Sequence, residues 1–374
     1  MVSKSKKSDY KVIGTRPIRH DGYDKVTGRA QYGADIKLPG MIYGAVLRSP
    51  HAHAKIKRID ISVAEKMKGV FAVMTAKDLP RLSDKQRGNS EESGSEKHLS
   101  ENVMAMDKVL YKGHVVAAIS AKDVNTAREA VKKIVVDYEV LKPVINVDQA
   151  MEKGAPILHE DFVGDHLGKK VKKTNIATYN KYTTGNTDEG FRKAHLIIEK
   201  EVELQTVHQG YIEPHNGTAI WDEDDRVKIW TSTQGSFANR DSVSKVLNLD
   251  VSRVKVTPLE IGGGFGGKIP VYLEPIAAVL SKKSRRPVQL VMSRTDVFDA
   301  SGPAPGGKVI VKIGVDKDGK MLAGYADIRL EAGGYPEAFI EAAAKCVFSC
   351  YDIPAMEIEA YDVLVNKPSS APYR

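Results

Sequence analysis

The stretch EIGGGFGGKIP, from Glu260 to Pro270, places five glycines in six consecutive positions around one phenylalanine. Such a run is costly, because a glycine loses more backbone entropy on folding than any other residue. It predicts a loop whose backbone approaches a ligand closely and presents N–H groups to it. These donors suit an anion or an oxo group, and the residues alone leave both open.

The same stretch matches two nucleotide-binding patterns, G-x-G-x-x-G and, through Lys268, a phosphate loop without its last letter. A phosphate loop needs Ser or Thr after its lysine to hold magnesium, and Ile269 occupies that position. The next strand, PVQLVMS, is followed by Arg294 and not by the acid that a dinucleotide site requires. The sequence therefore disfavours nucleotide binding.

The composition indicates a globular protein with room for two or three domains, since 374 residues are 42% hydrophobic and 28% charged. No apolar run approaches the ~18–20 residues of a membrane span. The N-terminus MVSKSKKSDYK is basic but lacks the apolar core of a secretory signal. We therefore expect a cytoplasmic protein without a membrane span.

The net charge of +8 raises nucleic acid as a partner, but the basic residues are spread along the chain. Only KKVKK, from Lys169 to Lys173, is a dense run, and it predicts a solvated loop or a patch that meets a partner subunit. No nucleic-acid-binding pattern accompanies it. Cys346 and Cys350 are expected to be ordinary buried or half-buried thiols, too few for an iron–sulfur cluster, which needs about four thiolates.

The patterning divides the chain into four parts. Short apolar runs such as HVVAAISA, followed by a helical period, predict a compact α+β domain over residues 17–145, after a flexible tail at 1–16. The polar stretch Gly164 to Gly190 predicts a linker, placed at 146–190. Alternating strands, two helices and an Asp-Lys-Asp-Gly hairpin predict a larger α+β domain with a mostly antiparallel sheet over 191–374.

The first domain resembles the a/b hammerhead domain of the xanthine dehydrogenase/aldehyde oxidase family of molybdenum hydroxylases. The stretches that carry this resemblance are DGYDKVTGRAQYGADIKLPGMIYGAVLRSPHAHAKI (Asp21 to Ile56), GVFAVMTAKDLP (Gly69 to Pro80) and YKGHVVAAISAKDVNTAREAVKKIVVDYEVL (Tyr111 to Leu141).

The second domain is similar to the family's first molybdopterin-binding domain. Its matching stretches are IEPHNGTAIWD (Ile212 to Asp222), STQGSF (Ser232 to Phe237), RVKVTPLEIGGGFGGK (Arg253 to Lys268), RPVQLVMSRTDVF (Arg286 to Phe298) and the closing SSAPYR. Each motif alone is modest, but their order and spacing over about residues 15–374 make the match specific. The expected fold class is therefore α+β, with a hammerhead domain followed by a molybdopterin-binding domain.

The resemblance implies a molybdenum–pterin cofactor, either alone or as its cytosine dinucleotide, and assigns roles to individual residues. Gln234 should hydrogen-bond an oxo ligand of the molybdenum. Gly264, Phe265 and Gly266 should bring backbone N–H groups to the molybdenum site, and Arg374 aligns with the active-site arginine beside the substrate. The resemblance implies no protein metal ligand, so His51, His53 and His215 are expected to organise the fold.

Two departures from the family pattern concern the substrate. In purine-oxidising relatives a Glu follows the lysine of GGGFGGK, where this chain has Ile269. Their second purine-binding position is an Arg, and the corresponding position in this chain falls near Ala342. A purine would therefore meet an apolar wall. This favours aldehydes, carboxylated N-heterocycles or aromatic acyl thioesters as small-molecule substrates.

A further departure concerns the partners. In the family a second molybdopterin domain follows the arginine matching Arg374 and carries the catalytic glutamate, and no Glu here has the G-x-G-E context of that base. We expect the N-terminal half of a split molybdenum subunit, inactive alone, whose partner is a second molybdopterin-binding subunit. Iron–sulfur and FAD subunits would complete the enzyme. The alternative is a truncated or orphaned binding or assembly protein without cofactor.

Overall fold

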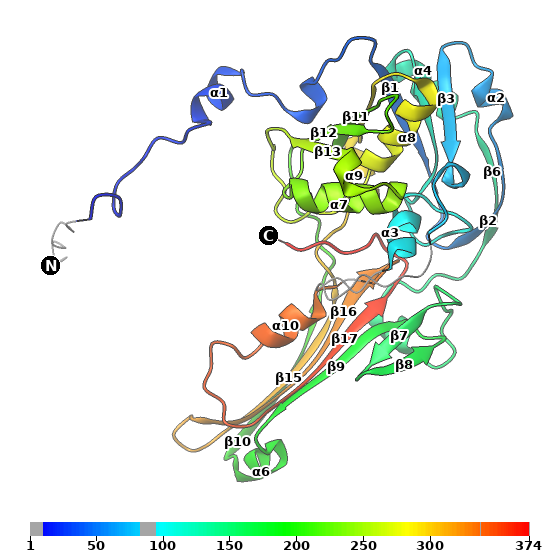
Figure 1. The fold of residues 1–374 in the computed structure, drawn as a ribbon. Coiled ribbons are helices and arrows are strands. Elements are labelled where there is room, and N and C mark those ends of the chain that lie inside the picture. The colour runs from blue at the N-terminus through cyan, green and yellow to red at the C-terminus, as the bar shows by residue number, and fades with distance from the viewer. Residues whose placement is uncertain (1–9, 83–94, 337, 374) are drawn as a thin grey trace.

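The computed structural model describes residues 10–82, 95–336 and 338–373. Figure 1 shows an upper lobe, in which helices pack on a sheet, above a long lower sheet. Helices and sheets together confirm the predicted α+β class. The upper sheet has the order β13-β12-β11-β14-β1-β5-β3, the lower one β10-β15-β16-β17-β9-β7-β8, and a small third sheet β4-β2-β6.

The strands of the upper sheet are β1 (Ile42–Arg48), β3 (Val70–Thr75), β5 (Val115–Ala121), β11 (Asn216–Trp221), β12 (Val227–Thr231), β13 (Val254–Pro258) and β14 (Val288–Val291). Those of the lower sheet are β7 (Val163–His166), β8 (Lys169–Lys172), β9 (Ile176–Thr184), β10 (Leu196–Leu204), β15 (Gly307–Val315), β16 (Met321–Gly333) and β17 (Met356–Leu364). The small sheet contains β2 (Ala54–Asp60), β4 (Lys108–Val109) and β6 (Val135–Val140). The α-helices are α1 (Gly22–Thr27), α2 (Ser62–Glu65), α3 (Glu96–Val103), α4 (Val124–Val131), α5 (Val147–Met151), α6 (Thr187–Lys193), α7 (Ser236–Leu247), α8 (Glu274–Ser284), α9 (Arg294–Ala300) and α10 (Ile340–Cys346).

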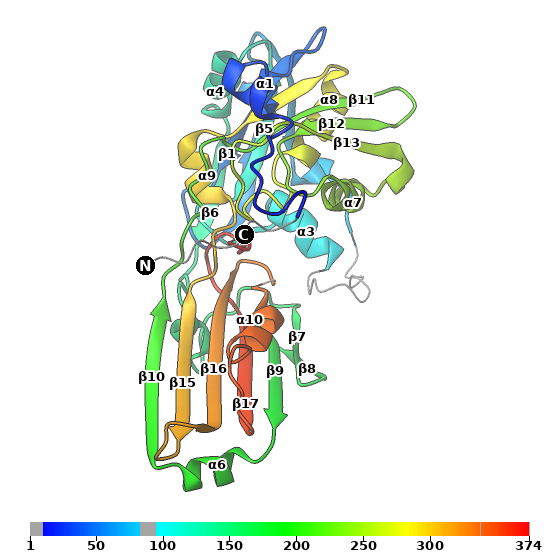
Figure 2. The same ribbon diagram turned by 90° about the vertical axis from the view of Figure 1, so that its left-hand side faces the viewer.

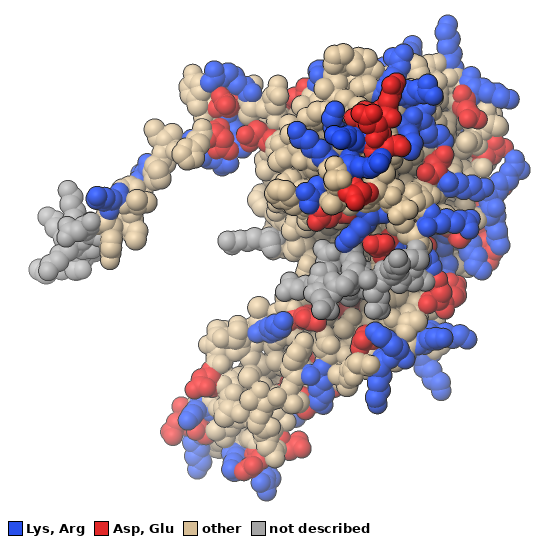
Figure 3. Space-filling view, in the orientation of Figure 1, with Lys and Arg blue, Asp and Glu red and all other residues tan. Residues whose placement is uncertain are grey.

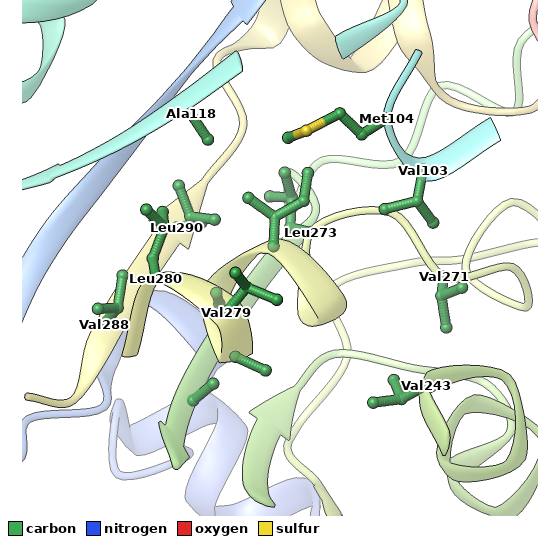
Figure 4. Close-up of a cluster of buried hydrophobic side chains, with 14 of the residues drawn as sticks. Val103, Met104, Ala118, Val243, Val271, Leu273, Val279, Leu280, Val288 and Leu290 are labelled. Atoms are coloured by element: carbon green, nitrogen blue, oxygen red, sulfur yellow. The ribbon is translucent and has the colours of Figure 1, made fainter. Parts of the chain in front are cut away.

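The upper sheet contains strands from both predicted domains. Strand β14 pairs in parallel with β1, so that Val288 lies opposite Ile42. Helix α8 covers this sheet, and its residues 274–281 are all buried. Figure 4 shows Leu280 from α8 and Leu290 from β14 in one apolar cluster, together with Met104, the residue that follows α3. Strands from both predicted domains therefore share one hydrophobic core.

The prediction of a linker at Gly164 to Gly190 is wrong, because this stretch folds as β7, β8, β9 and α6. Strand β9 pairs with β17 from Thr184 to Ile176 and buries Ala177 in the lower core. The stretch is polar because β8 forms the edge of the sheet with three exposed residues, and the neighbouring strand β7 is mostly only partly buried. The domain boundaries themselves remain a prediction.

The basic run Lys169 to Lys173 is likewise not a loop, since its first four residues form the edge strand β8. Its lysines at 169, 170 and 172 are exposed. On the face shown in Figure 3, Lys and Arg are interspersed with Asp and Glu over the upper lobe. The positive net charge is therefore not gathered into one patch on this face.

The predicted tail at 1–16 lies partly outside the described residues, which begin at residue 10. In Figure 1 the segment carrying α1 extends away from the upper lobe. None of the helices in the described residues combines the length and the apolar character needed to cross a membrane. Cys346 and Cys350, expected to be buried or half-buried, are both exposed free thiols at and beyond the end of α10.

A buried group of aromatic rings packs the segment around α3 against the residues that follow β16. The ring centroids of His98 and His159 lie 5.0 Å apart, and that of Tyr335 lies 5.2 Å from His159 and 6.1 Å from His114. Burial lowers the pKa of His98 to about 3 and that of His114 to about 4. Burial also lowers the pKa of His159, although its bond to the Gly334 carbonyl opposes the shift. These imidazoles are therefore neutral in the folded protein near pH 7.

We expect the free energy of unfolding to fall as the pH is lowered from 7.5 to 5.5. The unfolded chain binds protons at its histidines below about pH 6.5, whereas His98 and His114 stay neutral in the native state. Each contributes a loss of about 1.4 kcal/mol per pH unit below the unfolded pKa. Urea unfolding at several pH values measures this slope, and His98→Phe should reduce it. A flat profile would contradict the prediction.

Candidate functional site

The topology explains why two stretches far apart in sequence meet. Strands β12 and β13 are parallel neighbours, with Thr231 opposite Pro258 at their ends. The carboxyl ends of parallel neighbours lie at the same edge of a sheet, so the residues that follow them are brought together. Gln234 follows β12, just before α7, and the glycine loop, defined as Gly262–Gly267, follows β13.

The side chain of Gln234 is fixed by the backbone of the glycine loop and of the residue after it. Its Oε1 accepts hydrogen bonds from the N–H groups of Gly266 at 2.8 Å and Lys268 at 3.1 Å. The Gln234 N–H in turn donates to the Lys268 carbonyl at 3.0 Å. Two backbone donors identify Oε1 as the oxygen. The Nε2 group therefore keeps its two donors, and Gln234 is exposed.

The glycines of the loop are required by close contacts with other segments. A Cβ on Gly264 would lie 2.5 Å from Gln234 Oε1, and one on Gly267 would lie 2.8 Å from Gln209 Oε1. Between them Phe265 adopts a left-handed conformation with φ of 50°, which is uncommon for a bulky residue, and the residue is 52% exposed. The glycines thus allow the loop backbone to contact Gln234, while the Phe265 side chain is exposed to solvent.

A buried ion pair ties the two ends of the loop together. The Nζ of Lys268 lies 2.7 Å from Glu213 Oε2, and the lysine side chain is 0% exposed. The same carboxylate oxygen accepts the Gly262 N–H at 2.8 Å. Burial lowers the pKa of Lys268, while the contact with Glu213 opposes the shift. Because the pair contacts both loop ends, it holds the loop in one conformation.

A hydrogen-bonded chain of side chains lies beneath the loop. The hydroxyl of Tyr211 lies 2.5 Å from His215 Nε2 and 2.8 Å from Ser301 Oγ, which lies 2.8 Å from His208 Nε2. A Cβ on Gly267 would also lie 2.8 Å from the Tyr211 ring, so this ring supports the loop directly. Burial raises the pKa of Tyr211 to about 12 and lowers that of His215 well below its usual value.

Two backbone groups set the direction of this chain. The Gly210 N–H donates to His208 Nδ1 at 3.0 Å, so the ring proton is on Nε2 and is donated to Ser301. The Ser301 hydroxyl donates to the Val297 carbonyl at 2.6 Å. Its oxygen therefore accepts the Tyr211 proton as well. Tyr211 must then accept a hydrogen bond from its other neighbour, the neutral imidazole of residue 215.

The structure brings together four of the five predicted site residues. Gln234, Gly264, Phe265 and Gly266 form one contact group, but the Gly266 N–H is engaged by Gln234. Within the described residues the N–H groups of Gly264 and Phe265 have no hydrogen-bond partner. Arg374 lies outside the described residues. The assigned roles remain predictions.

The other singled-out residues lie elsewhere. Ile269, two residues after the glycine loop, is 38% exposed, and Ala342 is an exposed residue of α10. The Nδ1–H of His53 donates to the Lys142 carbonyl at 3.0 Å, and the His51 ring packs on Tyr138. In the described part of the chain, no group of three or more His, Cys, Asp or Glu could hold a metal ion.

Sequence reasoning missed the ion pair and the hydrogen-bonded chain. The sequence around Lys268 suggests only a phosphate-loop lysine, because its partner Glu213 lies 55 residues earlier. Ser301 carries no motif at all. The one signal in the sequence is the stretch HQGYIEPH, residues 208–215, which supplies Glu213 and three members of the chain.

Comparison with known proteins agrees with this geometry. The model of the molybdopterin cofactor-binding domain matches residues 168–374, more than half of the chain. The model of the aldehyde oxidase and xanthine dehydrogenase a/b hammerhead domain matches residues 27–142. The chain belongs to the xanthine dehydrogenase/aldehyde oxidase family of molybdenum hydroxylases. The predicted fold of a hammerhead domain followed by a molybdopterin-binding domain is thereby confirmed.

Several curated members of the aldehyde oxidase and xanthine dehydrogenase family are similar over almost the whole chain. A probable xanthine dehydrogenase subunit of Bacillus subtilis is 29% identical over 96% of this chain and 46% of its own length. The nicotinate dehydrogenase large molybdopterin subunit of Eubacterium barkeri is 28% identical over 98% of this chain and 82% of its own length.

A solved family member has the same fold. The CO dehydrogenase from Oligotropha carboxidovorans superposes with a TM-score of 0.84 at 30% identity, covering 96% of this chain and 45% of that one. The chain therefore spans about half the length of the Bacillus subtilis and Oligotropha carboxidovorans relatives, and most of the Eubacterium barkeri subunit.

Proposed function

We propose that this chain forms one side of a molybdenum–pterin site in an oxidoreductase that hydroxylates an aldehyde, an N-heterocycle or a related aromatic substrate. The observation that carries the proposal is the orientation of Gln234. Two backbone N–H groups hold its oxygen, so that its exposed NH2 group is left as a donor at the glycine loop.

The residues present fit a cofactor rich in acceptor oxygens. Besides the Gln234 NH2 group, the N–H groups of Gly264 and Phe265 have no partner within the described residues. All three donors come from one contact group, which the buried Lys268–Glu213 pair makes rigid. Preorganised donors of this kind stabilise negative charge without having to reorganise. A nucleotide phosphate is less suitable, since Ile269 replaces the magnesium-binding hydroxyl.

When bound, the molybdenum–pterin group would supply a two-electron oxidation in which oxygen from water is inserted at an electron-poor carbon. Gln234 would orient the group through its NH2 donors. Phe265 would exclude water, because its exposed ring lies beside those donors. Ile269 would give the substrate an apolar neighbour, which favours aldehydes and carboxylated N-heterocycles over purines.

The remaining parts of the enzyme are proposed to lie on other polypeptides. A second molybdopterin-binding chain would supply the glutamate base, and Arg374 of this chain would contact the substrate. Iron–sulfur and FAD subunits would carry the electrons away. The division is supported by the relative named as a large molybdopterin subunit, of which this chain covers 82%.

Gln234→Glu should separate the two functions of this side chain. One carboxylate oxygen can still accept the Gly266 and Lys268 N–H groups, but the other cannot donate as the amide does. We expect turnover to fall by about 10²–10³-fold, as for loss of one preorganised donor. The unfolding midpoint should stay close to that of the wild type. Gln234→Leu, which loses both functions, should lower turnover and stability together.

The proposal is tested on the complex purified from its source through a tag on this chain. Native mass spectrometry should find a second large chain and the excess mass of a molybdopterin, and metal analysis should find molybdenum. Nicotinate and an aromatic aldehyde serve as substrate probes. A bare chain without cofactor mass would overturn the proposal and favour an orphaned binding or assembly protein.

A further inference from the structure

Strand β10 is an exposed edge of the lower sheet. Among the described strands it pairs only with β15, and it lies at the left-hand side of that sheet in Figure 2. Every residue from His195 to Gln205 is exposed. One face of this strand carries an apolar row of four side chains with Lys200 at its centre. The four are each 38–52% exposed: Leu196, Ile198, Val202 and Leu204.

The two edges of the same sheet differ in their protection. Natural edge strands are protected from association by shortness, by lysines, by proline or by bulges. Strand β8 at the opposite edge has four residues, three of them lysines. Strand β10 has nine residues, only one of them a lysine and none a proline, and an unbroken register with β15 from Leu196 to Leu204. It is therefore a long, regular edge with one mostly apolar face, of the kind that accepts another strand.

The charges on β10 indicate what kind of strand fits. Glu199, Glu201 and Glu203 alternate on the face opposite the apolar row. An antiparallel pairing of β10 with a second copy of itself would place these glutamates opposite one another, and like charges directly opposite are destabilising. Lys308 of β15 reaches Glu201 at 3.0 Å, while the other two glutamates have no ion pair within the described residues. A complementary strand would carry Lys or Arg on this face.

The position of β10 connects this edge to the candidate site. The chain leaves β10 through Val207, which is 50% exposed, and reaches Tyr211 and Ile212 within a few residues. The next N–H, that of Glu213, donates to the Gly262 carbonyl of the glycine loop at 3.1 Å. The segment that follows β10 is therefore bonded directly to the glycine loop.

We propose that β10 is the docking edge for a strand of a separate polypeptide in which apolar residues alternate with Lys or Arg. This inference rests on the proposed function, because the occupant is the second molybdopterin-binding chain of the complex. The added strand would bond to the free N–H and C=O groups of β10 and cover its apolar row.

Hydrogen exchange in the tagged complex tests the docking. Strand β6, an edge of the small sheet with exposed Val135 and Val140, is the internal comparison. About half of the β6 amides should be protected, because alternate N–H groups of an edge strand face solvent. Nearly all amides of β10 should be protected. Half-protection of β10 in a complex that holds the second chain and molybdenum would overturn the inference alone.

A pair of variants tests the contact by assembly. Ile198→Lys should weaken binding of the second chain by about 10- to 100-fold, as expected for loss of one buried aliphatic side chain. Val140→Lys, at a residue of similar exposure on β6, should leave assembly unchanged. Equal assembly of both variants would overturn the docking, as would a homodimer formed through β10. Absence of any second chain and of molybdenum would overturn the proposed function as well.

Discussion

Lys268→Met is expected to lower the free energy of unfolding by about 3–5 kcal/mol, because removal of one partner leaves a buried charge unpaired. The Lys268 side chain is fully buried, and its partner Glu213 is 11% exposed. Methionine fills a similar volume, so the loss reports the charge and not a cavity. Urea unfolding of the two proteins at pH 7.5 measures the difference.

Two further variants make this result specific. Lys282→Met removes an exposed lysine that lies 3.3 Å from Asp225, and should change stability by less than about 1 kcal/mol. The double variant Lys268→Met with Glu213→Gln should recover part of the loss, since the neutral amide can still accept the Gly262 N–H. A single variant as stable as the Lys282 control would mean that the ion pair does not hold the loop.

Gly264→Ala is expected to abolish most cofactor binding while the protein still folds. Its Cβ would lie 2.5 Å from Gln234 Oε1, closer than any contact between such atoms, so the glutamine must move. That displacement breaks its bonds to the Gly266 and Lys268 N–H groups and should cost about 1–3 kcal/mol of stability. Molybdenum and pterin content of the purified complex should fall by about tenfold or more.

Gly22→Ala is the matched control for this substitution. A Cβ on Gly22, in α1, meets only Arg19 at 3.5 Å, which is ordinary contact. This variant should keep its cofactor and its stability. Full cofactor content in Gly264→Ala would show that the close approach of the loop to Gln234 is not needed for binding.

The parts of the fold that sequence patterns predicted are those with strong burial. The runs that became β1, β3 and β5 are apolar and β-branched, and helix α4 buries Ala127, Ala130 and Val131 as its period indicated. Strands β7 to β9 were missed because few of their residues are fully buried, so their composition is polar and resembles that of a linker. Hydrophobic periodicity in a sequence reflects which side chains are buried, and a strand near a sheet edge buries few of them.

The site divides in the same way. The resemblance predicted that Gln234 and the glycine loop belong to one site, and they are in contact. It did not predict that the Gly266 N–H is used to orient Gln234, because that bond depends on the parallel pairing of β12 and β13. The partnership of Lys268 with Glu213 is equally a consequence of topology, and no single-sequence pattern encodes it.

The parallel pairing of β14 with β1 has a consequence for how this chain can be rearranged. Residues matched by two separate family models contribute neighbouring strands to one sheet. Exchanging only one of these segments with that of a relative would set foreign side chains against Ile42 and Val288 in the middle of a shared core. A chimera that preserves the core must therefore take both segments from the same parent sequence, so the two would be exchanged in evolution as one unit.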